Sequence, residues 1–226
     1  MGTITTGRTL DADGAPVAGT GFSYEEDGPL AGLLRERDGP LTSHPTRPSW
    51  GTLPTPADDG DGMTALSILG PGYDGPPEHY HEVSTEYFEI EHGTVVFDVD
   101  GTEHRVSAGE SFTVPTDTVH SFRCPADGGM AVMRTRIAPA GRIGHVLPTF
   151  GGIAHDPEVD VDDTLQRVAL AKRLQGDTVF TDPDPRVAKP LIDALAPLAR
   201  LRGYRGGYGK YSQPAFWERH VEQPDL

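Results

Sequence analysis

The stretch 77–88 contains residue types and a spacing that could bind a metal ion. His79 and His81 are two residues apart, and Glu86 follows shortly after them. In a β-strand, residues two apart project from the same face with their Cα atoms about 7 Å apart, so two imidazoles can meet on one ion. In a helix the same pair would point in different directions, and Pro77 disfavours a helix here. The sequence therefore predicts a strand that presents both histidines as ligands.

A fourth candidate ligand, His120, completes a second spaced motif further along the chain. The two motifs are His79-x-His81-x4-Glu86-x6-Gly93 and Gly109-x5-Pro115-x4-His120. In this order they resemble the two motifs of the cupin family, over roughly residues 63–137. The resemblance implies a small β-barrel in which the three histidines and the glutamate bind one divalent transition metal. Imidazole and carboxylate suit Fe, Mn, Ni, Co, Cu or Zn, and the donor types alone do not choose among them.

Two positions depart from the usual pattern of this family. Asp117 stands where a glycine is usual, in the turn before His120, and Cys124 stands where an asparagine is frequent. The first departure leaves the conformation of that turn open. The second removes a polar neighbour of the site but none of its ligands.

Short alternating segments surround the two motifs and predict an antiparallel barrel or jelly roll. The candidate strands cover residues 63–69, 94–99, 103–106, 111–114, 119–124 and 130–137. Asp100-Gly101 is a strong hairpin signal between two of them. If the histidines face inward, strand parity turns a set of apolar residues to the same side, and their simplest role is barrel core: Phe88, Ile90, Val95, Phe97 and Phe122.

The expected fold class is all-β, a cupin-type double-stranded β-helix or jelly-roll barrel with extensions at both ends. We divide the chain into an irregular N-terminal arm (1–60), the barrel (61–140) and a C-terminal helical extension and tail (141–226). The arm is rich in Gly, Pro, Asp and Thr, so we expect it to wrap the barrel with little regular structure and to be anchored by Trp50 and Leu53.

Helical signals are expected only after Pro148. Asp162 or Asp163 can cap a helix that runs to about Leu174. A second apolar stretch follows over residues 187–201, where two prolines must start, kink or divide the helix, and Gly203 can end it. The glycine- and tyrosine-rich segment 203–211 is expected to be a flexible tail.

Composition excludes several classes of function. The chain has 226 residues with 34 acidic and 19 basic side chains, a net charge of -15. Such acidity argues against nucleic acid as a partner, because phosphate contacts need Lys and Arg, and it suits a halophilic source. The single cysteine excludes an intramolecular disulfide and a zinc site built on CxxC. The sequence shows neither a membrane helix nor a signal peptide, so we expect a cytoplasmic protein with no membrane partner.

The resemblance implies a metal-dependent dioxygenase, an oxidoreductase, but does not fix its substrate. The candidate wall residues are Phe and Val rather than Arg, which favours a small apolar or aromatic substrate. Two alternatives stay open: a cupin that binds or senses a small molecule without turnover, and a metal-dependent isomerase. Tyr73 and Glu78 lie close to the first motif and are candidates for orienting a substrate or acting as base, and Glu86 could be a ligand or a base. Exposed barrel edges need covering, so we also expect a homodimer in which an extension crosses to the partner barrel.

Overall fold

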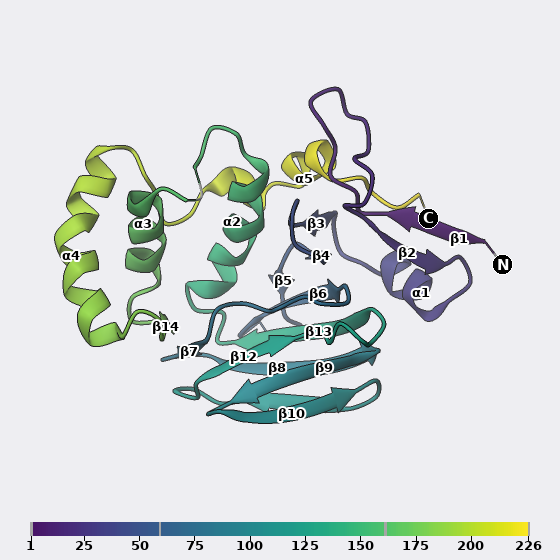
Figure 1. Cartoon of the computed structure of the whole chain (residues 1–226), viewed down its shortest axis with the longest axis horizontal. Coiled ribbons are helices and arrows are strands. Elements are labelled where there is room, and N and C mark those ends of the chain that lie inside the picture. The colour runs from purple at the N-terminus through teal and green to yellow at the C-terminus, as the bar shows by residue number, and fades with distance from the viewer. Residues whose placement is uncertain (1, 59, 161, 226) are drawn as a thin grey trace.

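The structure, a computed structural model, describes residues 2–58, 60–160 and 162–225. Two antiparallel sheets make up its β-barrel (Figure 1). One sheet has the strand order β10-β9-β12-β7-β14 and the other β11-β8-β13-β6-β4-β3, with β5 also paired to β6. The barrel strands are β6 (Met63–Leu69), β7 (His79–His81), β8 (Thr85–His92), β9 (Thr94–Val99), β10 (Thr102–Ser107), β11 (Ser111–Val114), β12 (His120–Arg123) and β13 (Ala131–Ala138).

The barrel strands confirm the alternation in the sequence. β6, β9 and β11 have the predicted bounds, and the predicted hairpin joins β9 to β10. Its two turn residues, Asp100 and Gly101, have φ of 50° and 76°, the left-handed conformation that a tight hairpin turn demands. The barrel interior is filled by the residues expected from strand parity together with their neighbours, namely Leu69, Phe88, Ile90, Val95, Phe97, Val106, Val114, Cys124, Ala131 and Met133, with Phe122 packed against them. The interior is therefore a packed apolar core.

The N-terminal arm is more regular than its composition suggests. It contains β1 (Thr3–Thr6), β2 (Phe22–Glu25), α1 (Pro29–Arg35), β3 (Leu41–Ser43), β4 (Ser49–Thr52) and β5 (Thr55–Pro56). β4 pairs with β6, so the arm continues one barrel sheet. Trp50 and Leu53 are buried, as predicted, and the Trp50 indole donates hydrogen bonds to the backbone oxygens of Gly7 and Thr20. Partners far along the chain thus order a segment that has little periodicity of its own.

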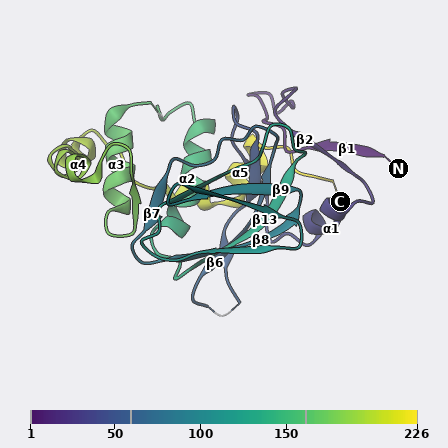
Figure 2. The same ribbon diagram turned by 60° about the horizontal axis from the view of Figure 1, so that its bottom comes forward.

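The C-terminal extension is mostly helical and lies along the barrel and the arm (Figures 1 and 2). Its elements are α2 (Ile143–His155), α3 (Thr164–Leu174), β14 (Thr178–Phe180), α4 (Pro185–Leu201), the 3-10 helix η1 (Gly209–Ser212) and α5 (Pro214–His220). Asp163 caps α3 through Leu165 N, and Gly203 follows α4 with φ of 88°, both as predicted. Within the described ranges, no helix combines the length and the apolarity that a membrane crossing requires.

The expectation that helices begin only after Pro148 was wrong. α1 lies in the arm, and α2 begins at Ile143 and contains Pro148 within it. Glycines and a proline give α2 a poor intrinsic helix propensity, but tertiary packing overrides it. At Gly152 an added Cβ would lie 2.3 Å from the Tyr211 ring, so the close approach of these two segments requires glycine.

The expected flexible tail is also corrected, because Tyr211 has no exposed surface. Its hydroxyl donates a 2.6 Å hydrogen bond to Asp156, and its carbonyl accepts one of 2.7 Å from the Trp217 indole. The arm and the extension share one hydrophobic core over the outer face of β6 and β13, in which Phe22, Leu34, Leu41, Trp50, Ile68, Val132, Ile153, Phe216 and Trp217 take part. The two ends of the chain therefore stabilise each other.

His155 lies beside this core and should make stability depend on pH. Its Nε2 is 3.0 Å from Ser43 Oγ, and burial lowers the pKa of the ring to about 4. An unfolded histidine titrates near pH 6.5, so unfolding takes up a proton between roughly pH 6.5 and 4. The contribution of neutral His155 to the free energy of unfolding is complete above that window and is lost as the pH falls. The loss is about 2 kcal/mol between pH 7.5 and 5.

We expect His155→Gln to reduce this pH dependence in urea unfolding of the metal-free protein, while other buried histidines such as His79 keep their own share of it. The exposed His104 supplies the matched control, and His104→Gln should leave the slope as in the wild type. If the stability of His155→Gln fell with pH as steeply as that of the wild type, the pH dependence would not come from His155.

Candidate metal centre

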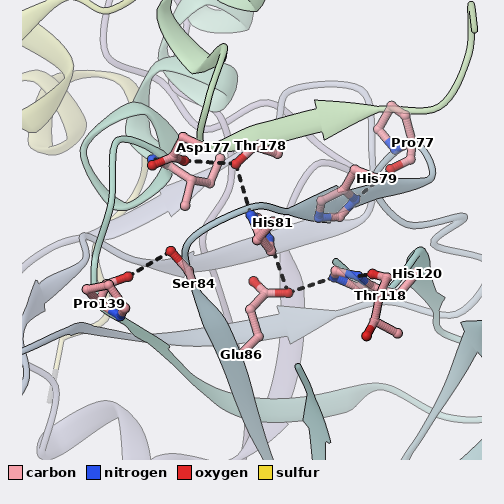
Figure 3. A network of polar contacts seen from close by, with 11 residues as sticks. Pro77, His79, His81, Ser84, Glu86, Thr118, His120, Pro139, Asp177 and Thr178 are labelled. Atoms are coloured by element: carbon pink, nitrogen blue, oxygen red, sulfur yellow. Dashed lines mark hydrogen bonds and ion pairs between the residues drawn. The ribbon is translucent and has the colours of Figure 1, made fainter. Parts of the chain in front are cut away.

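The four predicted ligands converge in one cluster (Figure 3). His79 and His81 lie on β7, and His120 lies on the neighbouring strand β12, where it pairs with His79. Glu86 comes from β8 in the other sheet. In the loop between β7 and β8, the Ser84 hydroxyl donates to the carbonyl of Pro139. The strand parity predicted for the two β7 histidines is thus confirmed, and barrel closure brings the carboxylate to them.

The distances between the donor atoms suit a single ion. One ligand atom from each residue lies within 4.8 Å of the other three. His120 Nε2 is 2.7 Å from Glu86 Oε2, and His81 Nε2 is 3.4 Å from the same oxygen. Ligands at 2.0–2.2 Å from an ion lie about 3 Å apart when adjacent and about 4.2 Å when opposite. Shifts of a few tenths of an ångström would therefore place all four donors on one ion.

Each of the three imidazoles has an acceptor on its outer side. His79 Nδ1 is 2.8 Å from the carbonyl of Pro77, and His120 Nδ1 is 2.9 Å from the carbonyl of Thr118. A carbonyl can only accept, so each Nδ1 carries a proton. His81 Nδ1 meets the Thr178 hydroxyl at 2.9 Å. These contacts leave the Nε2 atoms to face the centre, the arrangement that second-shell partners impose on metal-binding histidines.

The electrostatics of the cluster also favour a cation. Burial opposes ionisation of Glu86, but the imidazoles of His120 and His81 outweigh it and hold the pKa of the carboxyl below its usual range. Burial, with His120 nearby, lowers the pKa of His79 to about 4, which keeps this ring neutral. Burial also disfavours protonation of His120, yet its hydrogen bond with Glu86 raises the pKa of the ring. An ionised carboxylate among buried imidazoles is a donor set for a divalent cation.

The residues present therefore fit a divalent transition metal. The buried Nε2 of His81 lies 3.4 Å from Glu86 Oε2 but makes no hydrogen bond in the described part of the chain, and a buried ring nitrogen without a hydrogen bond is costly. An ion would satisfy it. Three imidazole nitrogens and one carboxylate oxygen would leave open positions on a five- or six-coordinate ion. Its identity among Fe, Mn, Ni, Co, Cu and Zn stays open.

The structure adds a supporting residue, Thr178, that sequence reasoning missed. β14 from the C-terminal extension pairs with β7 and places Thr178 opposite His81. The Thr178 hydroxyl donates to Asp177 Oδ1 at 3.0 Å, so it accepts from His81 Nδ1. Asp177 also accepts the backbone N–H of Ile143 at the start of α2. Because Thr178 lies 97 residues after His81 in the chain, no local spacing could have revealed this contact.

Thr178→Val should weaken metal binding about 10- to 100-fold, the usual cost of losing an outer partner of a ligating histidine. Valine keeps the shape of threonine but cannot accept the His81 Nδ1–H. Competition with a chromogenic chelator measures the change, and Thr178→Ser, which retains the hydroxyl, is the matched control. Equal affinities for the valine and serine variants would show that the hydroxyl does not orient His81.

Asp117 adopts the backbone conformation that the usual glycine of the second motif would adopt. Its φ of 59° lies in the left-handed region, which Asp and Asn adopt more readily than most residues. Its N–H donates to the carbonyl of His81 at 2.8 Å. The turn before His120 is therefore tied directly to the strand that carries the first two ligands. Cys124 is buried in the barrel core and donates to the carbonyl of Gly129, a structural role.

The other two site candidates lie outside the four-residue cluster. The Glu78 side chain is exposed and accepts a 2.7 Å hydrogen bond from the Thr181 hydroxyl. The Tyr73 ring packs near the Phe122 ring. The Arg47 guanidinium lies over the Tyr73 ring, 5.0 Å from its centroid. Their catalytic roles stay predictions. Phe180 on β14 is the aromatic neighbour of the cluster, with its ring 6.0 Å from that of His79.

Comparison with known proteins agrees with this geometry. The Cupin_2 model of the cupin domain matches residues 65–135. "Polyketide synthase CurC" of Streptomyces cyaneus is 33% identical over 109 residues, which cover 46% of this chain and 70% of that protein. Quercetin 2,3-dioxygenase of Bacillus subtilis is 41% identical over 58 residues, which cover 26% of this chain and 17% of that protein.

A solved structure, the RmlC-like cupin of Shewanella frigidimarina, has a TM-score of 0.39 and 19% identity, over 46% of this chain and 86% of that one. The family match spans both histidine motifs and the strands between them. The related synthase extends the similarity over more than two thirds of its own length. The chain therefore belongs to the cupin family.

Proposed function

We propose that this cupin is a divalent-metal-dependent oxidoreductase that uses O₂ on a small, largely apolar or aromatic substrate. The observation that carries the proposal is the convergence of three Nε2 atoms and one ionised carboxylate beside apolar side chains. An ion bound there would supply a Lewis acid with open positions for an enolate or phenolate oxygen of the substrate. The protein residues would then bind, orient and deprotonate that substrate.

Substrate access is proposed on the side of His79 and Glu86, each 7% exposed, because His81 and His120 are more deeply buried. Phe180 flanks this side and belongs to an apolar cluster with Ile137, Ile143 and Leu174. Such walls suit an aromatic or aliphatic body better than a phosphate. Glu86 is ionised at neutral pH because its carboxyl pKa is depressed, so it can accept a proton from an enol or a phenol if it is not held as a ligand.

The names of two relatives support this substrate class. One is a quercetin dioxygenase and the other a polyketide synthase. Flavonols and polyketides both contain enolisable or phenolic oxygens next to a carbonyl, which can meet one cation. We therefore propose an aromatic or β-dicarbonyl compound as the substrate of this chain.

The test loads the purified protein separately with Fe, Mn, Ni, Co, Cu or Zn and follows oxygen consumption. The panel contains flavonols, catechols, β-diketones and small thiols. We expect at least one metal form to consume oxygen with a flavonol or a β-diketone, and His81→Ala to consume none. Tight binding of these compounds without oxygen uptake by any metal form would replace the proposal with a binding or sensing role.

A metal-dependent isomerase or cyclase is the second candidate. A relative that is covered over 70% of its own length is called a synthase rather than an oxidase. The same ion and carboxylate could stabilise an enolate without any oxidation. Product analysis under anaerobic conditions separates the two, because only isomerisation or cyclisation would continue without oxygen.

A further inference from the structure

The outer face of α4 carries an apolar stripe, which we define as Val187, Leu191, Ala194, Leu198 and Leu201. The four larger side chains are 66%, 57%, 40% and 83% exposed. They make up four of the seven exposed large hydrophobic residues in the described part of the chain. Spacings of four, three, four and three residues place all five on one side of the helix, as in the seam of a coiled coil.

The opposite face of α4 is held firmly against the protein. Ala199 is buried, and Lys172 of α3 forms a 2.7 Å ion pair with Asp193. At the end of the helix, the Tyr204 hydroxyl donates to Asp163 at 2.6 Å. In both views α4 lies at the outer edge of the molecule, with α3 between it and the barrel (Figures 1 and 2). The stripe is therefore presented outward on a fixed support.

We propose that the stripe pairs with the same stripe of a second copy, with the two α4 helices antiparallel. Counted from Ala194, the other positions lie at -7, -3, +4 and +7. A twofold axis at Ala194 therefore sets Val187 opposite the partner's Leu201 and Leu191 opposite the partner's Leu198. This near symmetry makes the surface self-complementary, as an isologous dimer interface requires. The small side chain of Ala194 lets the two backbones approach at the axis.

Charges at the helix ends favour the antiparallel arrangement. Asp184 precedes the first turn of α4 and Arg202 follows its last turn. They are 18 residues apart, five full turns, so both lie along the same edge of the stripe. Antiparallel pairing brings Asp184 near the partner's Arg202 and opposes the two helix dipoles. Parallel pairing would set Asp184 against its own copy.

The form of the stripe favours a helix over a membrane as its occupant. All five side chains are aliphatic and the stripe is one seam wide, whereas helices at a membrane surface use a broad apolar face that often carries aromatic residues. The net charge of -15 also opposes binding to anionic lipid. A helix of 17 residues is about 25 Å long, which makes a small interface and a dissociation constant on the order of micromolar. This dimer uses α4 alone and does not depend on the proposed function.

Cysteine cross-linking tests the register. Under mild oxidation, Ala194→Cys should form a covalent dimer, since residues on the axis come within the 4.4–6.8 Å Cα separation that a disulfide needs. Lys189→Cys, on another face of α4, should stay monomeric, and the wild type controls for the buried Cys124. Val187→Cys should not link to itself, because antiparallel pairing separates the two copies by about 21 Å. A Val187→Cys homodimer, or none from Ala194→Cys, would overturn the proposal.

Sedimentation provides the second measurement. The wild type should be dimeric at roughly 100 μM, and the double substitution Leu191→Asp, Leu198→Asp should raise the dissociation constant by more than about 100-fold. Circular dichroism and metal content should not change, because these side chains are exposed and remote from the metal centre. A wild type that is monomeric throughout would overturn the proposal, as would monomers that bind phosphatidylserine vesicles through the stripe.

Discussion

His81→Ala is expected to abolish stoichiometric metal binding while the barrel stays folded. His81 is 2% exposed, and its Nε2 faces Glu86 at 3.4 Å. Alanine removes one of four donors and also leaves the Thr178 hydroxyl without its imidazole partner. The loss should exceed the 10- to 100-fold cost of removing an outer partner, so we expect more than about 100-fold in affinity. Elemental analysis and chelator competition measure it.

His104→Ala is the matched control, because it removes an imidazole that is exposed on β10 and matches neither motif. It should bind metal like the wild type. The fold of both variants is checked by circular dichroism. A His81→Ala protein that is folded and still binds one equivalent of metal with unchanged affinity would show that the centre does not use this imidazole.

Trp217→Ala is expected to lower the free energy of unfolding by about 3–5 kcal/mol. The indole has no exposed surface, and its N–H donates to the carbonyl of Tyr211 at 2.7 Å. Alanine would leave a large cavity between the arm and the C-terminal extension and a buried carbonyl without its partner. Both effects lower stability, and urea unfolding at neutral pH measures the sum.

Two further variants separate packing from the hydrogen bond. Trp217→Phe keeps much of the ring volume and loses the indole N–H, so it should cost clearly less than Trp217→Ala. Val17→Ala, at a site that is 40% exposed, should change stability by no more than about 0.5 kcal/mol. If Trp217→Ala were as mild as Val17→Ala, the shared core of the two chain ends would not contribute to stability as we describe.

Local sequence predicted most of the barrel strands and the shared face of His79 and His81, whereas Glu86 and His120 were predicted from the resemblance to the two cupin motifs. A strand has a period of two, so alternation alone located β6, β9 and β11 and set His79 and His81 on one face. The Asp-Gly pair marked a hairpin because tight turns need left-handed residues. The same short-range rules placed the cap of α3 at Asp162 or Asp163 and its end near Leu174, and the structure selects Asp163. In each case the information lies within a few residues of the element.

Only the tertiary structure decided how the extensions behave. α2 contains four glycines or prolines in its interior and would not be stable alone; burial against Tyr211 and the cap from Asp177 make it a helix. The tail is ordered because Tyr211 and Trp217 have partners far away in the chain. For the same reason Thr178 was invisible to sequence reasoning, since its role arises from β14 pairing with β7. Side-chain parity is a local property of the backbone, whereas these contacts depend on chain segments that meet only after folding.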